Sequence, residues 1–452
     1  MYGSDTIVAA ATPPGSGALA ILRVSGPEAL TLAQRVFGFS KSPEPRRATL
    51  ARYRDVQGET VDELVYVFYE EGKSFTGESM LELMPHGSPL IVQLLLEDMV
   101  ARGCRLADPG EFTRRAFLQG KLDLTQAESI VEVINARSRA ALSAAQRQLS
   151  GEVGRKVDVF VSRLLGVSAH LEAYIDFPEE DLPPEDQAGP AQDLAALTEE
   201  MQQLEATSHY KQLLQEGVRT VILGEPNAGK SSLLNRLLGE DRAIVSDLPG
   251  TTRDYLEASL MVGPFLLRVI DTAGIHETAD AIEKQGVDRA LQQVNRADLL
   301  LLVLDATHPV PALPEPVQQA LREKPALVLY NKTDLAENPA GRFELDGIPQ
   351  LQVSAKTGAG VSDLLFHVEH LLRDRVVIPQ EDSVLVSARH ATALARARGC
   401  IVEAREKLQR DEPTELVASD LRDAIDAMGE IVGRIDNEAM LDTLFAKFCI
   451  GK

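Results

Sequence analysis

The first quarter of the chain contains short runs of apolar and β-branched residues that are separated by turn-forming residues. These runs lie at residues 6–8, 20–24 and 64–69, and the segment Pro13-Pro14-Gly15 separates the first two. Runs of this kind, bounded by proline and glycine, are typical of short strands. We therefore predict a mixed α+β domain over residues 1–119.

The next region and the end of the chain have their apolar residues at helical spacing. The predicted helical segments lie at residues 125–174, 190–215 and 387–452. An acidic stretch that contains proline, at residues 176–186, is expected to form an exposed loop. The pattern predicts one all-α helical domain that is discontinuous in the sequence and is formed by residues 120–215 and 380–452.

Between the two helical parts, apolar strands alternate with amphipathic helices. The predicted strands lie at residues 218–224, 266–271, 299–305, 326–330 and 351–353. This alternation indicates a parallel sheet with crossover helices. We therefore predict an α/β domain over residues 216–379, inserted into the helical domain, so that the chain is a multidomain α+β and α/β protein.

The charge balance limits how this chain can interact with nucleic acids. Among 452 residues, 46 are basic and 68 are acidic, which gives a formal net charge of −22. Because affinity for phosphates comes from local Lys and Arg, general attraction to nucleic acid is not expected. An RNA substrate would need a local basic face or a basic partner protein. The arginine-rich segments at residues 137–147 and 389–398 are either such a face or solvated helix surfaces.

The cysteines and the apolar runs indicate the compartment. Cys104, Cys400 and Cys449 are widely spaced and include no C-x-x-C pair, which argues against a disulfide framework and fits a reducing cytosol. The longest strongly apolar run, at residues 299–304, is far shorter than the roughly 18 residues of a membrane span. No signal peptide is recognisable. We expect a cytoplasmic location without membrane association.

One segment has the pattern of a phosphate-binding loop. Residues 224–231 read Gly-Glu-Pro-Asn-Ala-Gly-Lys-Ser, which fits G-x-x-x-x-G-K-[ST], and a helix is predicted directly afterwards at 232–238. Backbone N–H groups of such a loop bind phosphates, and the Lys230 ammonium would neutralise charge on the β- and γ-phosphates. The Ser231 hydroxyl is a hard ligand that suits Mg²⁺. The segment predicts a nucleoside triphosphate bound with Mg²⁺.

Two later motifs, each at the end of a predicted strand, indicate which base is bound. In Asn331-Lys332-Thr333-Asp334, the carboxylate of Asp334 can accept hydrogen bonds from N1–H and from the 2-amino group of guanine. In Ser354-Ala355-Lys356, backbone N–H groups can donate to guanine O6. Adenine lacks both of the donors that Asp334 would bind, so we expect GTP to be preferred over ATP.

Two further segments are expected to contact the γ-phosphate and the metal. Asp271-Thr272-Ala273-Gly274 ends a predicted strand, and Gly250-Thr251-Thr252 precedes that strand. Thr252 is the predicted second Mg²⁺ ligand. In this order and spacing, the four motifs resemble those of the translation-factor-type GTPases, which have a Ras-like P-loop fold.

The residue that follows Asp271-Thr272-Ala273-Gly274 differs from the one that small signalling GTPases have at this position. They have a Gln there that orients the attacking water, whereas this chain has Ile275. Water must therefore be placed by another group. The carboxylates of Glu277, Asp280 and Glu283 follow closely and either take part in this or lie on a solvated helix surface.

Motifs outside the GTPase region carry a resemblance to a known family. They are Asp5-Thr6-Ile7-Val8-Ala9, Ser74-Phe75-Thr76-Gly77-Glu78, Pro109-Gly110-Glu111-Phe112-Thr113-Arg114-Arg115-Ala116-Phe117, Lys121-Leu122-Asp123-Leu124-Thr125-Gln126-Ala127-Glu128 and Phe448-Cys449-Ile450-Gly451-Lys452. Together they resemble the MnmE (TrmE) family of tRNA-modification GTPases along the whole chain. The terminal Cys-Ile-Gly-Lys is specific to that family.

The resemblance implies a function. It implies an N-terminal domain that binds tetrahydrofolate and forms a homodimer, and a GTP hydrolase that potassium stimulates. Such proteins act with the FAD-dependent partner MnmG (GidA), in a heterotetrameric or larger complex, on the C5 atom of the wobble uridine of certain tRNAs. The group added is carboxymethylaminomethyl or aminomethyl, and the one-carbon donor is 5,10-methylene- or 5-formyl-tetrahydrofolate. FAD and NADH enter only through the partner.

The resemblance also assigns residues to ligands. For GTP, the motifs and the resemblance together give Asn227, Ala228, Gly229, Lys230, Ser231, Ser232, Ser246, Asp247, Leu248, Pro249, Gly250, Thr251, Thr252, Asp271, Thr272, Ala273, Gly274, Asn331, Lys332, Asp334, Ser354, Ala355 and Lys356. The implied potassium ligands are Asn227, Ser246, Leu248 through its backbone, and Thr251. Glu283 is the implied catalytic residue that positions water. The implied folate-binding residues are Arg23, Glu82, Lys121 and Lys452.

Two other functions remain open from the sequence. One is a ribosome-assembly or RNA-binding GTPase switch, and the other is a folate-dependent enzyme that the GTPase merely regulates. Cys449 is either a nucleophile or a residue with a role in structure or in a cofactor pocket, and no activating base stands beside it in the sequence.

Overall fold

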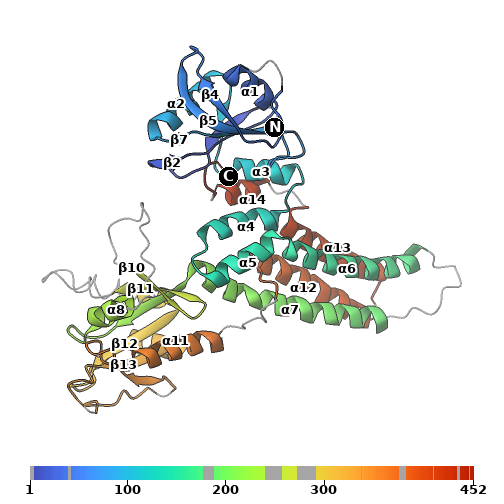
Figure 1. The fold of residues 1–452 in the computed structure, drawn as a ribbon. Helices are drawn as coiled ribbons and strands as arrows, with labels where there is room; N and C mark the ends of the chain where they lie inside the picture. Colours follow the sequence, from blue (N-terminus) through green and yellow to red (C-terminus); the bar gives the residue numbers. More distant parts are fainter. Residues whose placement is uncertain are drawn as a thin grey trace. The chain divides into compact units, whose positions relative to one another are not determined.

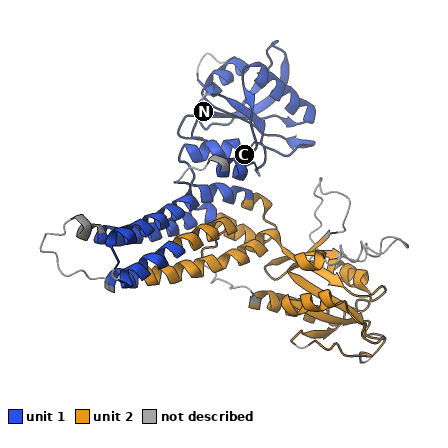
Figure 2. Cartoon of the chain, turned by 180° about the vertical axis from the view of Figure 1, so that it is seen from behind, with its two compact units in different colours: residues 1–131, 148–193, 399–452 blue, residues 132–147, 194–398 orange. Residues whose placement is uncertain are grey.

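The computed structural model describes residues 5–38, 42–176, 188–239, 257–271, 292–336, 338–345, 347–375, 383–410, 412–434, 438–446 and 448–451. The chain forms two compact units, which Figure 2 shows in different colours. Unit 1 comprises Met1–Val131, Gln148–Asp193 and Gly399–Lys452, and unit 2 comprises Glu132–Arg147 and Leu194–Arg398. Each is described by itself below.

The N-terminal part of unit 1 is a mixed α+β fold, as the sequence predicts. Its six-stranded sheet has the order β4-β5-β6-β3-β1-β8, and only the outer pair β1 and β8 is parallel. The strands are β1 (Ile7–Ala10), β3 (Leu22–Ser25), β4 (Thr49–Arg54), β5 (Thr60–Tyr69), β6 (Met80–Met84) and β8 (Arg105–Leu106). A separate two-stranded sheet pairs β2 (Gly17–Leu19) with β7 (His86–Gly87).

Two helices complete the core of this part, which Figure 1 draws in blue. They are α1 (Ala29–Phe37) and α2 (Pro89–Ala101). Leu32 of α1 and Leu95 of α2 share one buried apolar cluster with Leu22 and Leu81 of the sheet. Burial of this apolar area is the main term that stabilises the fold.

The helical prediction is confirmed on both sides of the α/β region. The helices are α3 (Glu111–Leu118), α4 (Leu124–Asn135), α5 (Arg139–Leu149), α6 (Glu152–Asp176), α7 (Ala188–Glu216), α12 (Ala388–Gln409), α13 (Thr414–Val432) and α14 (Glu438–Phe445). Within unit 1, α13 packs along α6, although the two helices begin 262 residues apart in the sequence. The predicted acidic loop at 176–186 lies, after Asp176, outside the described residues.

Unit 2 contains a six-stranded sheet of the order β10-β11-β9-β12-β13-β14, parallel except for the edge strand β10. The strands are β9 (Val218–Leu223), β10 (Glu257–Val262), β11 (Phe265–Asp271), β12 (Leu299–Asp305), β13 (Ala326–Asn331) and β14 (Gln350–Gln352). The described helices beside them are α8 (Lys230–Gly239), α10 (Glu315–Glu323) and α11 (Val361–Arg375). The predicted parallel strands are confirmed, and β10 was not predicted.

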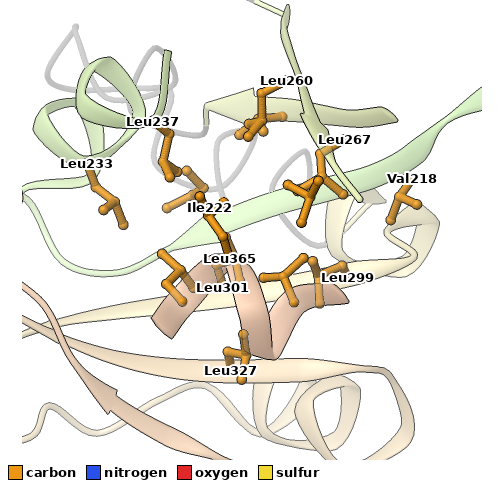
Figure 3. Close-up of a cluster of buried hydrophobic side chains, with 14 of the residues drawn as sticks. Val218, Ile222, Leu233, Leu237, Leu260, Leu267, Leu299, Leu301, Leu327 and Leu365 are labelled. Atoms are coloured by element: carbon orange, nitrogen blue, oxygen red, sulfur yellow. The ribbon is translucent and has the colours of Figure 1, made fainter. Parts of the chain in front are cut away.

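Apolar clusters cover both faces of this sheet, which explains the nearly continuous apolar sequence of β12 and β13. Figure 3 shows one face, where Leu233 and Leu237 of α8 and Leu365 of α11 pack with Ile222 and Leu301. Because these strands are parallel, the polar residues at their carboxyl ends gather at one edge of the sheet.

Helix α7 leads directly into β9 through one glycine. Gly217 has φ +79°, and a Cβ there would lie 2.8 Å from the carbonyl oxygen of Leu266. The guanidinium of Arg268 donates to the carbonyl of Glu216 at 3.3 Å. The junction is therefore tightly packed and tolerates only glycine.

None of the described helices is both long enough and apolar enough to cross a bilayer.

Candidate nucleotide-binding site

The loop between β9 and α8 has the backbone that a phosphate cradle needs. Gly224 has φ +146°, and a Cβ there would lie 2.2 Å from the carbonyl oxygen of Val303. Gly229 has φ +93°, and its Cβ would lie 2.2 Å from Nδ2 of Asn331. Asn227, between them, is exposed and has the left-handed φ of 66°. The loop can take this path only because glycines occupy the two crowded positions.

The first residues of α8 place a cation and hydroxyls beside the loop. Lys230 is buried, and its Nζ donates to the carbonyl oxygens of Gly224 and Glu225, both at 2.9 Å. Ser231 and Ser232 are exposed on the first turn of the helix. A helix N-terminus with a lysine and a hydroxyl suits a phosphate and its Mg²⁺ ion, so the residues present fit the metal that the motif implies.

Asn331, at the end of β13, joins the phosphate loop to a second loop. Its Nδ2 donates to the carbonyl of Ala228, and its Oδ1 accepts from the backbone N–H of Ala355, both at 2.9 Å. Asn331 is 2% exposed, so both of these hydrogen bonds are shielded from water. The side chain fixes the distance between the two loops that would hold the phosphates and the base.

The candidate base-reading carboxylate is held in a defined orientation. The Ser354 hydroxyl donates to Oδ1 of Asp334 at 2.7 Å. The ammonium of Lys356 lies 3.9 Å from the other carboxylate oxygen of Asp334. Since a carboxylate oxygen can accept two hydrogen bonds, Asp334 keeps capacity for the paired donors of guanine.

A second carboxylate, that of Asp305, supports this site, and the sequence analysis did not identify it. Lys332, with the left-handed φ of 66°, donates from Nζ to Oδ2 of Asp305 at 2.7 Å. Burial would raise the pKa of Asp305, but hydrogen bonds from Lys332 and Thr307 outweigh it and hold that pKa well below its usual value. The available signal was that Asp305 ends an apolar strand, as Asp271 and Asn331 do.

The structure brings the described residues of the predicted GTP set to one edge of the sheet: Asn227, Ala228, Gly229, Lys230, Ser231, Ser232, Asn331, Lys332, Asp334, Ser354, Ala355 and Lys356. Asp271 ends β11 beside Ile222 of β9. The predicted residues Ser246, Asp247, Leu248, Pro249, Gly250, Thr251, Thr252, Thr272, Ala273, Gly274, Glu283 and Lys452 lie outside the described residues. All of these ligand roles stay predictions.

In unit 1, Arg23 and Glu82, two of the residues predicted to bind folate, form a second polar site. Arg23 of β3 lies directly opposite Glu82 of β6, and its Nε donates to the Glu82 carboxylate at 2.9 Å. The Tyr69 hydroxyl donates to the other oxygen of Glu82 at 3.2 Å. The Arg23 guanidinium lies 5.5 Å from the ring centre of Phe75. A carboxylate, a cation and an aromatic ring therefore meet on one surface of the sheet.

Lys121 contacts the loop, and the end of the chain contacts the strand, that adjoin this polar site. The Lys121 ammonium donates to the carbonyl of Gly72 at 2.7 Å, in the loop that carries Phe75. A Cβ on Gly451, which has φ +88°, would lie 2.3 Å from the carbonyl of Ala10. Ala10 ends β1, and the preceding residue of that strand lies opposite Arg23. The terminal segment is thus packed against the strand next to the polar site.

Cys449 is exposed in this terminal segment, and its carbonyl accepts from the backbone N–H of Gly110 at 3.4 Å. By contrast, Cys104 is buried in the N-terminal core, and burial raises the pKa of its thiol to about 11. Such a thiol is almost wholly protonated at neutral pH and is a poor nucleophile. The structure places Cys449 but assigns it no chemistry.

Three of the family-like motifs meet in an ion network around the buried Arg115. Arg115 is 2% exposed, and its guanidinium donates to Glu111 at 2.9 Å, to Glu78 at 3.1 Å and to Asp5 at 2.8 Å. Burial would raise the pKa of Asp5, but hydrogen bonds from Arg105 and Arg115 lower it. Because its charges are paired inside the fold, we interpret this network as structural.

Comparison with known proteins agrees with this architecture along the chain. A family model described as the MnmE helical domain matches residues 124–449, and one described as the GTP-binding protein TrmE N-terminus matches residues 6–121. Among solved structures, Era from Aquifex aeolicus is 26% identical, with 40% of this chain and 66% of that chain covered and a TM-score of 0.26.

Curated relatives match over nearly the full length. The tRNA modification GTPase MnmE of Opitutus terrae is 46% identical over 452 residues, which cover 99% of this chain and 99% of the relative. The protein of the same name from Akkermansia muciniphila is 41% identical over 453 residues, again with 99% of both chains covered. This chain therefore belongs to the MnmE family of tRNA modification GTPases.

Proposed function

We propose that this GTPase acts with the FAD-dependent partner MnmG to add a carboxymethylaminomethyl or aminomethyl group to C5 of the wobble uridine of certain tRNAs. The one-carbon unit comes from 5,10-methylene- or 5-formyl-tetrahydrofolate, and NADH acts only through the partner. Residues 1–119 hold the folate and form a homodimer, residues 216–379 bind GTP, and the helical residues 120–215 and 380–452 join them. The complex with MnmG is heterotetrameric or larger.

The observation that carries this proposal is the polar site of Arg23 and Glu82 beside the terminal segment. A tetrahydropterin presents the same paired N–H donors as guanine, and a carboxylate such as Glu82 can accept both. Phe75 offers an aromatic surface for the ring system. The cations of Lys121 and Lys452 would suit the acidic tail of folate. A plain GTPase switch needs none of these groups.

The terminal segment gives this part of the proposal a test. Replacing Gly451 by Ala is expected to weaken tetrahydrofolate binding at least tenfold and to abolish tRNA modification, while GTP hydrolysis is spared. The added Cβ would collide with the carbonyl of Ala10 and push the segment away from the polar site. Deleting residues 449–452 is expected to have the same effects. Tetrahydrofolate titration and a GTPase assay measure them.

Gly399→Ala is the matched control, because a Cβ at Gly399 meets no atom within 4 Å. It is expected to leave both activities unchanged. If Gly451→Ala instead lowered folate binding and GTP hydrolysis equally, the variant would be unfolded globally and the terminal segment would have no specific role.

An exposed apolar patch supports the homodimer. Leu90 and Leu94 lie four residues apart on α2 and are 63% and 41% exposed, and Leu19 of β2 is 64% exposed. The strand β7, which pairs with β2, contacts α2. Exposed large apolar residues that gather in this way are typical of protein interfaces.

Potassium stimulation is proposed from the phosphate loop. Asn227 is exposed, and its left-handed backbone turns the loop at the position where the family holds the ion. A cation there would supply the positive charge that other GTPases obtain from an arginine. Ser246, Leu248 and Thr251 would complete its ligands, and Glu283 would position the attacking water.

Contact with tRNA is proposed to be shared between two surfaces. In this chain of net charge −22, Arg137, between α4 and α5, and Arg139, the first residue of α5, are exposed and offer local positive charge. The partner protein supplies the rest of the basic surface. This division reconciles an acidic chain with an RNA substrate.

One experiment decides between this function and the alternative, a ribosome-assembly or RNA-binding GTPase switch. In cells that lack the protein, mass spectra of tRNA nucleosides are expected to lose the C5-modified wobble uridine completely. Re-expression of the wild-type chain should restore it, and Lys230→Ala should not, because that variant lacks the phosphate-binding ammonium. An unchanged nucleoside profile would remove the proposed pathway and favour the alternative.

A further inference from the structure

One arginine connects the phosphate side of the nucleotide site to its base side. Arg236 lies on α8, the helix that begins with Lys230, and it is half-buried. Its Nε donates to the carbonyl oxygen of Ala355 at 3.2 Å, and its Nη2 donates to that of Lys356 at 2.6 Å. A single planar guanidinium thus holds two consecutive peptide groups of the base loop.

These contacts determine the direction of one backbone N–H group. The carbonyl of Ala355 and the N–H of Lys356 belong to the same peptide bond, and no described peptide bond is cis. In a trans peptide the two groups point in opposite directions. Because the Ala355 oxygen points at Arg236, the N–H of Lys356 points away from α8.

The other N–H groups of this loop already have acceptors. Ser354 donates to Ala359 O at 2.9 Å, Ala355 to Asn331 Oδ1 at 2.9 Å, Thr357 to Ser354 Oγ at 3.1 Å and Gly358 to Ser354 O at 2.8 Å. Within the part of the chain that the structure describes, only the Lys356 N–H of residues 354–358 has no acceptor. It is the donor that remains available for a ligand.

We infer that Arg236 is a positioning residue for base selection, which aims the Lys356 N–H at O6 of guanine. This inference rests on the proposed base site, in which Asp334 accepts from N1–H and the 2-amino group. The guanidinium also polarises the peptide it binds, which makes the Lys356 N–H a stronger donor. The base would then be read along its Watson–Crick edge, at O6, N1–H and the 2-amino group, by groups of fixed direction.

The test compares three nucleotides on the full-length protein with Mg²⁺. GDP offers every contact, 6-thio-GDP replaces O6 by the weaker acceptor sulfur, and IDP lacks only the 2-amino group. In Arg236→Met, GDP and IDP are each expected to bind about three- to tenfold more weakly, as for loss of one hydrogen bond. Binding of 6-thio-GDP should change less than twofold. The ratio of GDP to 6-thio-GDP affinity falls toward one, while the ratio of GDP to IDP is kept.

Two control variants separate positioning from general structure. Arg236→Lys, which keeps a cationic donor but not the planar fork, is expected to restore part of the preference for GDP over 6-thio-GDP. Asn235→Ala changes the exposed neighbour on the same helix and should leave all three affinities as in the wild type. A purely structural role of Arg236 would weaken the three nucleotides by one common factor.

Different results would contradict the role of Arg236 and the base site itself. If Arg236→Met left the ratio of GDP to 6-thio-GDP unchanged, or weakened all three nucleotides equally, the role of Arg236 would be wrong while the base site stood. If the wild-type protein bound GDP and ADP equally, the proposed base site itself would be wrong.

Discussion

GTP turnover by the wild-type protein is expected to be about 10²–10³ times faster in potassium than in sodium at equal ionic strength. Ile275 has no group that can orient water, so unaided hydrolysis should be slow. A potassium ion held by Asn227 and the loop around Ser246 and Thr251 would place positive charge beside the phosphates. One such electrostatic contribution typically changes a rate by this factor. Phosphate release at saturating GTP measures it.

Variants of Asn227 distinguish the contribution of the potassium ion from that of the loop backbone. Asn227→Lys should lose the potassium dependence, because its ammonium would occupy the place of the ion. Asn227→Gly keeps the left-handed backbone, which glycine adopts readily, and removes the ligand. It should therefore bind GDP normally but hydrolyse GTP slowly in either salt.

A variant of Glu283 tests the water-positioning role in the same assay. In the proposed mechanism, potassium also pairs the GTPase domains of two protomers. Glu283→Ala should keep this pairing and still hydrolyse GTP slowly. Asn235→Lys, on an exposed helix position, is the control for added charge and should behave as the wild type. Equal rates in the two salts for the wild-type protein would contradict this mechanism.

Replacing Asp334 by Asn is expected to move the nucleotide preference from guanine to xanthine by about 10²–10⁴ in the ratio of affinities. The carboxylate would make two charge-assisted hydrogen bonds to guanine, each contributing about 1.5–3 kcal/mol. An amide can instead donate to the 2-oxo group of xanthine while it accepts from N1–H. The Ser354 hydroxyl, now donating to the carboxylate, can donate to the amide oxygen and keep the side chain in place.

Competition of GDP and XDP against a fluorescent nucleotide measures this switch. Asp334→Ala should bind both weakly, because it can neither accept nor donate. Asp363→Asn makes the same chemical change at an exposed position of α11 and should keep the wild-type preference. Unchanged preference for GDP in Asp334→Asn would show that another residue reads the base.

The parts of the fold that could be predicted are those in which a local pattern is tied to one structure. The apolar runs of β12 and β13 and the glycines of the phosphate loop specify their elements with few residues. The edge strand β10 was missed because it pairs on one side only and its sequence mixes polar and apolar residues. Tertiary pairing with β11 overrides this weak local preference.

The supporting residues of the candidate site could not be predicted for a different reason. Arg236 and Ala355 are 119 residues apart, and Lys332 and Asp305 are 27 apart. Neither contact leaves a periodic trace in the sequence, because each depends on which strand ends meet at the sheet edge. Sequence motifs indicate which residues contact the ligand. The residues that hold these ligand-binding residues in place are recognised only in the structure.

The glycine junction between α7 and β9 has a mechanical consequence. Residues 194–216 of that helix, which belong to unit 2, extend about 35 Å at 1.5 Å per residue. Because Gly217 is packed against Leu266 and Arg268, the joint cannot absorb rotation as a loose linker would. A rotation of about 5° of the sheet would therefore displace the far end of this segment by about 3 Å. The helix would therefore act as a lever that pivots at Gly217, and the single strand β9 connects this pivot to the predicted phosphate loop at Gly224.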